Sequence, residues 1–358
     1  MNSGAKTLII LSPGFPANEG DSTCIPPQQV FVKNLKLIFP GLNIIVLAFE
    51  YPFFSLPYQW NNITVIPFGG RNRAKLFRLR NWVSIRATLT RLNKQNHLLG
   101  LLSFWMGDRA FIGNAFAKKH NLPHFCWLLG QDARPGNKYF RLTKPESRSL
   151  IALSDFIAGE FIKNYGISPA HIIPVGIDPG MFNTPPHVRD IDILGAGSLI
   201  PLKQFSKLIN LVKNLHSAFP GIKAVICGNG PEQQLLENMI SEHHLENNVE
   251  LVGELPHEHV LGLMQRAKIF VHPSSYEGLG VVCLEALHAG AQVVSFVRPM
   301  NAEIKNWHVA HAQGDMLNIV KALLQNPALD HTPVTPYLVA DACKAMMKLF
   351  GYKEFATS

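Results

Sequence analysis

The chain of 358 residues is 47% hydrophobic and 16% charged, and it carries a net charge of +8. This composition excludes a disordered chain and is sufficient for two domains of ordinary size. No apolar run approaches the ~20 residues of a membrane span, and the first one, residues 7–11, is too short for a signal peptide. The five cysteines have neither metal-ligand nor redox spacing, so we expect reduced thiols in a cytoplasmic protein.

The first half of the chain alternates apolar runs with helical patterns. Strands are predicted at residues 7–11, 43–49, 63–68, 98–104, 124–129, 150–153 and 172–175, and helices at 28–39, 109–120 and 155–165. Residues 52–58 contain three aromatic residues and two prolines, which is typical of a loop.

A basic segment interrupts this first half. Residues 51–107 contain no Asp or Glu but eight basic residues, and leucine, phenylalanine and tryptophan lie among them. Such a mixture suits the surface of an anionic membrane, although a solvated helix face would look the same. Nucleic acid is not expected as a partner, because no nucleic-acid-binding motif accompanies the charge. The predicted membrane patch consists of Arg71, Arg73, Lys75, Arg78 and Arg80.

The second half of the chain is more regular. Strands are predicted at residues 191–197, 223–228, 249–253, 268–273 and 292–296, and helices at 202–219, 231–244, 257–267 and 281–289. This alternation predicts parallel sheets covered by helices on both faces. We therefore expect an α/β protein with two doubly wound, Rossmann-like domains that face each other across a cleft. The predicted domains are residues 1–184 and 185–337, with a last helical segment, 338–358, packing back on the first domain.

The most informative segment joins a predicted strand to a predicted helix. Glu277 and Glu285 lie eight positions apart, and the turn Gly278-Leu279-Gly280 follows Glu277 directly. The amides of a turn that opens a helix suit a phosphate, while carboxylates accept hydrogen bonds from sugar and ribose hydroxyls. The segment therefore predicts a site for a nucleotide-sugar.

This segment resembles the Glu-x7-Glu signature of the retaining glycosyltransferases of family four. The resemblance implies a GT-B fold and a nucleoside-diphosphate sugar as the donor. It implies that Glu277 contacts the transferred sugar, that Glu285 contacts the ribose, and that the amides of Gly278, Leu279 and Gly280 stabilise the diphosphate. It also implies retention of anomeric configuration, with neither an enzyme nucleophile nor a metal cofactor.

Three further segments of the chain resemble the family. Lys203 matches a lysine that neutralises the leaving diphosphate, so Glu277 and Lys203 are the expected catalytic residues, whereas Ser198 stands where the family usually has an arginine. Arg298 or a cation from the first domain could replace that arginine. Gly253 lies where the family's backbone contacts the base, and Gly20 lies in the loop after the first strand, where backbone could approach a phosphate or acceptor. Ser198, Gly253 and Gly20 are expected to be donor-binding residues.

The first domain departs from the family pattern after two of its strands. Residues 103–108 lack the usual histidine, and Leu129 occupies a second histidine position. The handling of the acceptor is therefore expected to fall to one or more nearby polar residues. The candidates are Asp108, Gln131, Asp132, Arg134 and Lys138.

These observations predict a retaining hexosyltransferase that transfers sugar to a saccharide or a lipid-linked acceptor in the synthesis of cell-envelope glycans. A peripheral position on the inner face of the cytoplasmic membrane would bring the enzyme to such an acceptor. Two alternatives remain open: a catalytically weak protein that binds sugar nucleotides or acts as a scaffold, and a sugar-nucleotide epimerase of the same fold. Base, sugar, linkage and oligomeric state are not predicted.

Overall fold

The computed structural model describes residues 4–71, 75–182 and 188–353 of the chain. The chain is divided into two compact units. Unit 1 comprises Met1–Gly176 and Val339–Ser358, and unit 2 comprises Ile177–Leu338. The division falls earlier than residue 184, because the backbone of Ile177 pairs with Tyr337 and Leu338 within unit 2.

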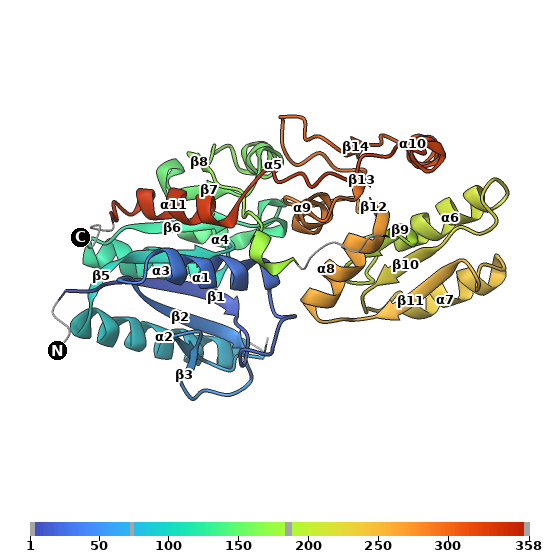
Figure 1. Ribbon diagram of the computed structural model, residues 1–358. Coiled ribbons are helices and arrows are strands. Elements are labelled where there is room, and N and C mark those ends of the chain that lie inside the picture. Colours follow the sequence, from blue (N-terminus) through green and yellow to red (C-terminus); the bar gives the residue numbers. More distant parts are fainter. Residues whose placement is uncertain (1–3, 72–74, 183–187, 354–358) are drawn as a thin grey trace. The chain divides into compact units, whose positions relative to one another are not determined.

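Unit 1 is built on an eight-stranded sheet, whose strand order is β3-β4-β2-β1-β5-β6-β7-β8 (Figure 1). Neighbouring strands are parallel except for β3 and β4, which form an antiparallel pair at one edge. The strands are β1 Lys6–Gly14, β2 Asn43–Tyr51, β3 Tyr58–Trp60, β4 Ile63–Pro67, β5 His97–Phe104, β6 His124–Leu128, β7 Leu150–Ala152 and β8 His171–Ile172.

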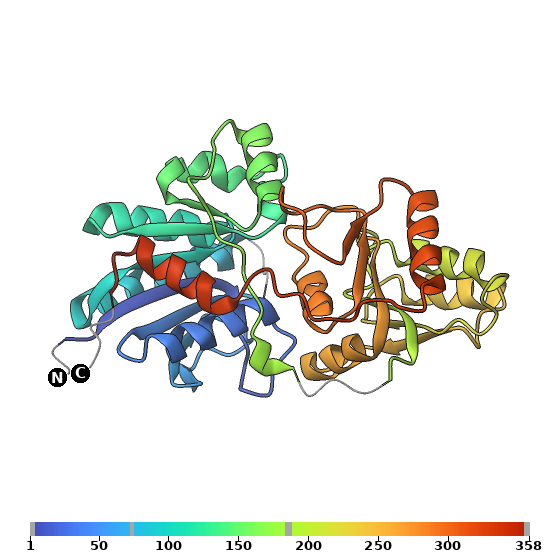
Figure 2. The same cartoon turned by 45° about the horizontal axis from the view of Figure 1, so that its top comes forward.

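Helices cover the faces of this sheet. They are α1 Pro26–Ile38, α2 Lys75–Gln95, α3 Asp108–His120, α4 Lys138–Thr143, α5 Asp155–Tyr165 and α11 Val339–Leu349, with short 3-10 turns η1 Gln131–Ala133 and η2 Ser147–Ser149. The last helix, α11, lies beside α1 although the two are far apart in the sequence (Figure 2). Its buried Met346 and Met347 bring the end of the chain into the core of unit 1.

Unit 2 is a six-stranded parallel sheet with the order β11-β10-β9-β12-β13-β14. Its strands are β9 Ile191–Ala196, β10 Ala224–Cys227, β11 Val249–Gly253, β12 Ala267–His272, β13 Gln292–Ser295 and β14 Trp307–Val309. Its helices are α6 Phe205–His216, α7 Gln233–Glu242, α8 His257–Arg266, α9 Val281–His288 and α10 Gln313–Gln325, with the 3-10 turn η3 Pro179–Met181.

The core of unit 2 explains why these sequences form a buried parallel sheet. Ile193, Ile226 and Ile269 come from three strands of the sheet and are each at most 1% exposed. β-Branched side chains fit the pleated surface of a sheet, and burying each one contributes roughly 1.5–3 kcal/mol. Amphipathic helices such as α6 complete this core, because Leu208 and Val212 lie on one face and are fully buried.

The order of the strands in unit 2 has a consequence for binding. The chain proceeds outward from β9 to β10 and β11, and then returns to the other side of β9 with β12. The loops that follow β9 and β12 therefore diverge at the carboxyl edge of the sheet, which is where doubly wound sheets bind ligands. In unit 1 the corresponding pair of strands is β1 and β5.

The structure confirms the predicted α/β class and the doubly wound sheets, and it adds elements that the patterns did not predict. These are α2, α4, α10, β3 and β14. The two strands are only three residues long, and the sequence of α2 is too polar on average for its apolar face to stand out. Among the residues that the structure describes, no helix is both long and apolar enough to cross a membrane.

The predicted membrane patch falls only partly within the described residues. Arg73 lies outside them, and Lys75 is the first residue of α2. Arg71 precedes the helix in left-handed backbone, and its guanidinium lies 5.2 Å from the centre of the Phe53 ring. Arg80 is exposed on α2, whereas Arg78 is half-buried.

Candidate functional site

Lys203 and Glu277 meet at the carboxyl edge of the sheet of unit 2. Lys203 lies in the loop after β9, and Glu277 lies in the loop after β12, the neighbouring strand. The Lys203 Nζ atom donates to Oε2 of Glu277 at 2.5 Å. The loops are also joined through their backbones, because the amide of Ser275 donates to the carbonyl of Leu202 at 3.0 Å. The structure therefore brings the two expected catalytic residues together at the point where the strand order reverses.

His272 is the third member of this cluster. It is the last residue of β12, and its Nε2 atom lies 3.0 Å from the same Oε2 atom of Glu277. Burial alone would raise the pKa of Glu277, but the hydrogen bond from His272 and the charge of Lys203 outweigh it and lower that pKa to about 2. Burial lowers the pKa of His272 itself. Glu277 is therefore a carboxylate at any physiological pH, so it can accept hydrogen bonds but cannot donate a proton.

The turn after Glu277 has the backbone that its sequence requires. Gly280 is the N-cap of α9 and adopts left-handed φ and ψ of 69° and 56°, a conformation that glycine adopts without strain. A Cβ atom at this position would lie 3.4 Å from Glu277 and 3.6 Å from Trp307. Gly278 and Leu279 are buried within the same turn. The glycines therefore let the chain pass directly from Glu277 into the first turn of α9.

Glu285 lies within α9 and is paired with a residue of α8. Its Oε1 atom is 2.8 Å from Nε2 of His257, and both side chains are less than 15% exposed. Burial opposes the charged form of His257, but the hydrogen bond to Glu285 prevails and raises the pKa of His257. A nearly enclosed carboxylate held by an imidazole is more precisely oriented than the solvated side chain that an exposed helix face would carry.

Two further predicted donor residues, Ser198 and Gly253, lie in neighbouring loops of the same edge. Ser198 is exposed directly after β9. Gly253 ends β11 with a φ of +73°, and its carbonyl accepts from the amide of Gly228 at 2.8 Å. Gly228 in turn packs on Gly197, since a Cβ atom added to Gly228 would lie 1.9 Å from the Gly197 carbonyl oxygen. These backbone contacts hold together the loops that follow β9, β10 and β11 at the carboxyl edge of the sheet.

Arg298 lies in the loop after β13, where it binds its own loop. Its guanidinium donates to the carbonyls of Met300 and Asn301, at 3.3 and 2.7 Å respectively. Glu303 is 3.9 Å away and 92% exposed, so this ion pair is weak. No contact between Arg298 and either Lys203 or Glu277 is seen in the structure of the described residues.

Two of the acceptor candidates in unit 1 are buried and already bonded. Asp108 begins α3, pairs with Arg109 at 3.0 Å and accepts from the Trp82 indole at 3.3 Å. Asp132 accepts from the amides of Met106 and Gly130, and burial raises its pKa despite those bonds. Asp132 thus joins the loops after β5 and β6, whereas Asp108 links the start of α3 to α2, and both contacts are structural.

The other candidates in unit 1 are more accessible. Gln131 and Lys138 are exposed, and the Lys138 amine lies over the ring of Tyr139. Arg134 is half-buried, and its carbonyl accepts a hydrogen bond from the Tyr165 hydroxyl. Gly20, the predicted donor-binding residue of unit 1, is exposed in the loop after β1, where its amide donates to Asn18 at 2.9 Å. These residues lie at the carboxyl edge of the sheet of unit 1, around the strands where its order reverses.

The sequence interpretation missed His257 and His272. His257 is the first residue of α8, and His272 is a 1% exposed residue of a central strand. One signal was available: a polar residue that ends an apolar run, five positions before Glu277, must either find a partner or be exposed. For metals, no group of three or more His, Cys, Asp or Glu side chains suited to an ion occurs within the described ranges.

Solved structures resemble the whole fold. A sucrose-phosphate synthase from Thermosynechococcus elongatus has a TM-score of 0.70 at 15% identity, covering 96% of this chain and 95% of that one. The Anabaena protein HepE in complex with UDP and glucose has a TM-score of 0.68 at 17% identity, with the same coverage. At such identities the likeness concerns the fold alone, and it confirms the GT-B architecture.

Curated relatives resemble part of the chain. A phosphatidylinositol N-acetylglucosaminyltransferase protein from Arabidopsis thaliana is 28% identical over 165 residues, which are 44% of this chain and 37% of that protein. A Mycobacterium tuberculosis glycogen synthase is 30% identical over 177 residues, 48% of this chain and 43% of that protein. The chain thus matches less than half the length of these relatives. Residues 181–323, a segment that carries Lys203, Glu277 and Glu285, match the model of the family described as glycosyl transferases group 1.

Proposed function

We propose that the chain is a retaining glycosyltransferase that moves a sugar from a nucleoside-diphosphate sugar to a saccharide or lipid-linked acceptor. The observation that carries this proposal is the Lys203–Glu277 pair beside the glycine turn of α9, at the switch point of unit 2. Its position within the segment that matches the glycosyl transferases group 1 family supports the same function.

In this proposal Lys203 stabilises the leaving diphosphate. Negative charge grows on the diphosphate as the bond to the sugar breaks, and fixed positive charge at that position is the main electrostatic need of the reaction. The Lys203 side chain is 19% exposed, so a ligand can reach it while Glu277 and the loop hold it in place. The amides that open α9 add partial positive charge.

Glu277 and Glu285 accept hydrogen bonds from hydroxyl groups of the donor. Glu277 binds hydroxyls of the transferred sugar, because its lowered pKa keeps it an acceptor. Glu285, oriented by His257, binds the ribose, and the backbone near Gly253 lies along the base. In unit 1, Gln131, Arg134 and Lys138 are the candidates for contacting the acceptor, while Asp132 orders the loop after β6 that carries them.

The proposed chemistry is retention without a covalent intermediate. The acceptor hydroxyl attacks on the face from which the diphosphate departs, and the diphosphate takes up the proton. Lys203 and the α9 amides supply the positive charge in this scheme, so the reaction is proposed to need no metal cofactor.

A panel of nucleotide-sugars tests this function. The full chain is incubated with each donor, with and without saccharide acceptors, and the release of nucleoside diphosphate is measured. Turnover of at least one donor that Glu277→Ala abolishes is expected. Binding of a nucleotide-sugar without any turnover would instead support a binding protein, and interconversion of the donor sugar without transfer would support an epimerase.

We also propose that unit 1 associates with the inner face of the cytoplasmic membrane, where a lipid-linked acceptor would lie. Leu79 and Val83 are 54% and 67% exposed and lie one turn apart on α2, beside the exposed Arg80. The loop before β3 exposes Phe53 and Leu56 by 56% and 78%. Exposed apolar side chains beside cations are typical of a surface that binds anionic lipid.

Vesicle co-sedimentation tests the membrane proposal. The chain should sediment with phosphatidylglycerol vesicles but not with phosphatidylcholine vesicles, and the triple variant Arg71→Gln, Arg78→Gln, Arg80→Gln should remain in solution. A control that removes the same charge from unit 2, Lys213→Gln, Lys223→Gln, Lys321→Gln, should still sediment. If both triple variants lose binding equally, the patch has no special role.

A further inference from the structure

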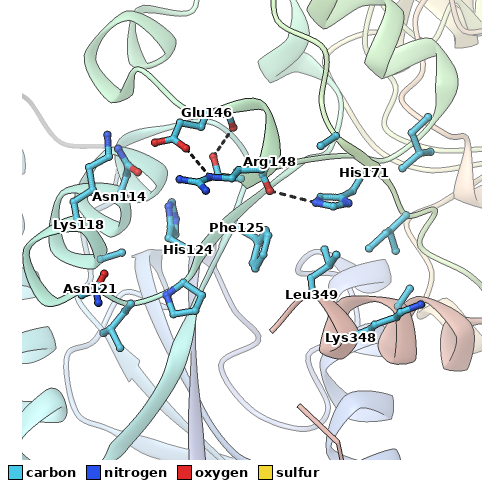
Figure 3. A pocket seen from close by; sticks show the side chains of 18 residues that line it. Asn114, Lys118, Asn121, His124, Phe125, Glu146, Arg148, His171, Lys348 and Leu349 are labelled. Atoms are coloured by element: carbon cyan, nitrogen blue, oxygen red, sulfur yellow. Dashed lines mark hydrogen bonds and ion pairs between the residues drawn. The ribbon is translucent and has the colours of Figure 1, made fainter. Parts of the chain in front are cut away.

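A groove of about 1060 Å³ lies in unit 1 (Figure 3). It lies at the end of the sheet where the strands begin, whereas the acceptor candidates lie at the end where the strands stop. Its walls include His124, the first residue of β6, Ser149, which precedes β7, and His171, the first residue of β8. In a parallel sheet these are amino-terminal ends, whereas the candidate acceptor residues follow carboxyl ends. The end of α3 and the end of α11 complete the groove. It is therefore a separate cavity from the proposed transfer site.

Positive charge is in excess along this groove. Three cations, Lys118, Arg148 and Lys348, line it together with one carboxylate, Glu146, which accepts from Nε of Arg148 at 2.6 Å. In Figure 3 the Arg148 guanidinium lies on the side of Lys118 and Asn114, while Lys348 lies toward the other end, beyond Phe125. Positive charge is thus available at both ends of an elongated cavity. A ligand that carries one negative charge would use only one of these ends.

The part of the groove between the cations is suited to a ring. The Phe125 side chain is held edge-to-face by Phe350 at 4.9 Å and by His171 at 6.1 Å, so its position is fixed by packing. Leu349 lies beside it in the groove (Figure 3). His124 also faces this space, and burial lowers its pKa to about 3, so it is neutral and adds no charge. Aromatic and aliphatic surface flanked by side-chain amides and imidazoles suits the apolar and hydroxyl faces of sugar rings.

We propose that this groove binds a short chain of acidic sugars. Such a chain repeats a carboxylate, sulfate or phosphate along its length, which matches cations at both ends, and it offers ring faces to the apolar middle. Asn121 and Asn114 at the rim supply amide groups for hydroxyls. The inference concerns binding alone and stands independently of the proposed transfer of sugar.

Lysines at the end of a helix have another possible role, and the chain offers a direct control for it. Lys118 and Lys119 both lie in the last turn of α3, where cations stabilise the helix dipole. Only Lys118 lines the groove, whereas Lys119 is exposed outside it. A role restricted to the helix dipole would make the two lysines equivalent, and a role in the groove would not.

Calorimetric titration of the full chain tests the ligand class. The probe is tetragalacturonate, with maltotetraose as a neutral saccharide of the same length and tetraglutamate as an acidic peptide of similar charge. Binding of tetragalacturonate, with at least tenfold weaker binding of the other two, is expected. Equal binding of maltotetraose would contradict the role of charge, and equal binding of tetraglutamate would contradict the preference for sugar rings.

Matched variants test the location. Lys118→Gln with Arg148→Gln should weaken the binding of tetragalacturonate about tenfold, since it removes two exposed charge contacts. Lys119→Gln with Lys163→Gln removes the same charge outside the groove and should leave binding unchanged. These side chains are exposed, and Arg148 is 83% exposed, so neither variant threatens the fold. An equal loss of binding in the two variants would overturn the proposal.

Discussion

The Lys203 Nζ atom lies 2.5 Å from Oε2 of Glu277, although 74 positions separate the two residues in the chain. Both side chains are about one-fifth exposed, at 19% and 22%. Their loops follow β9 and β12, which are neighbours in the sheet only because the chain crosses back over β9. An ion pair in this position can bind a ligand and also stabilises the join between the two loops, and variants can separate these two effects.

Removal of the Glu277 charge should impair turnover. Glu277→Gln keeps the size of the side chain but weakens its bonds to Lys203 and to a sugar hydroxyl, so a 10²–10³-fold loss in kcat is expected, of the order seen when one preorganised electrostatic contact is removed. The release of nucleoside diphosphate measures this loss. Glu258→Gln, on a 76% exposed side chain of α8, is the control and should retain full turnover. Equal activity of the two variants would exclude Glu277 from the reaction.

The same carboxylate should make unit 2 sensitive to acid. The folded-state pKa of Glu277 is about 2, below its ordinary value of 4.5. Its stabilising contribution is therefore complete above pH 4.5 and is lost as the pH falls from 4.5 toward 2. Chemical denaturation across this range should show a loss of on the order of 2 kcal/mol that Glu277→Gln lacks. If the free energy of unfolding fell equally with pH in the wild type and in Glu277→Gln, Glu277 would have an ordinary pKa.

The pair His257–Glu285 should have the opposite dependence on pH. The pKa of His257 is raised in the folded state, so its contribution is complete below the ordinary value of 6.5 and is lost as the pH rises through the raised folded value. The midpoint of thermal unfolding should therefore fall between about pH 6 and pH 8 more steeply in the wild type than in His257→Gln. His259→Gln, on a 62% exposed histidine, should behave as the wild type does. A wild-type slope in His257→Gln would contradict this prediction.

Two glycines of unit 2 should respond oppositely to alanine. Gly228→Ala would place Cβ 1.9 Å from the carbonyl oxygen of Gly197 at a φ of +148°, so it should destabilise the protein by roughly 3 kcal/mol or more. Gly262 lies inside α8, and a Cβ atom added there would have no atom within 4 Å, so Gly262→Ala should stabilise by about 0.5–1 kcal/mol. Denaturant titration measures the change in the free energy of unfolding of both variants. If Gly228→Ala left this free energy unchanged, the loops that carry Gly228 and Gly197 would not be in close contact.

The last helix should be necessary for the stability of unit 1. Met347 is fully buried in α11, which packs on α1, so Met347→Ala should cost about 2–5 kcal/mol. Lys344→Ala, at an exposed position of the same helix, should change the free energy of unfolding by no more than about 0.5 kcal/mol. If the two variants were equally stable, α11 would not contribute to the core.

Several features could be predicted because they depend on short stretches of sequence. The apolar run that forms β12, the glycine turn and the start of α9 at Val281 all follow from local pattern and turn chemistry. The helix α2 was harder to predict, since it has no strong apolar stripe and only Ile85 and Leu89 are fully buried among its side chains from residue 77 onward. The three-residue strand β14 carries too little pattern to be recognised, although its Trp307 packs against Gly280.

By itself the sequence determined the α/β alternation, the position of Glu277 before a helix-opening glycine turn, and the candidate set Lys203, Glu277 and Glu285. Only the tertiary structure decided which side chains are partners: His272 with Glu277, and His257 with Glu285. Strand order and helix packing, which result from the burial of apolar surface over the whole unit, bring such residues together. A histidine has no periodic preference that would reveal its partner, so its role follows from the environment in which the fold places it.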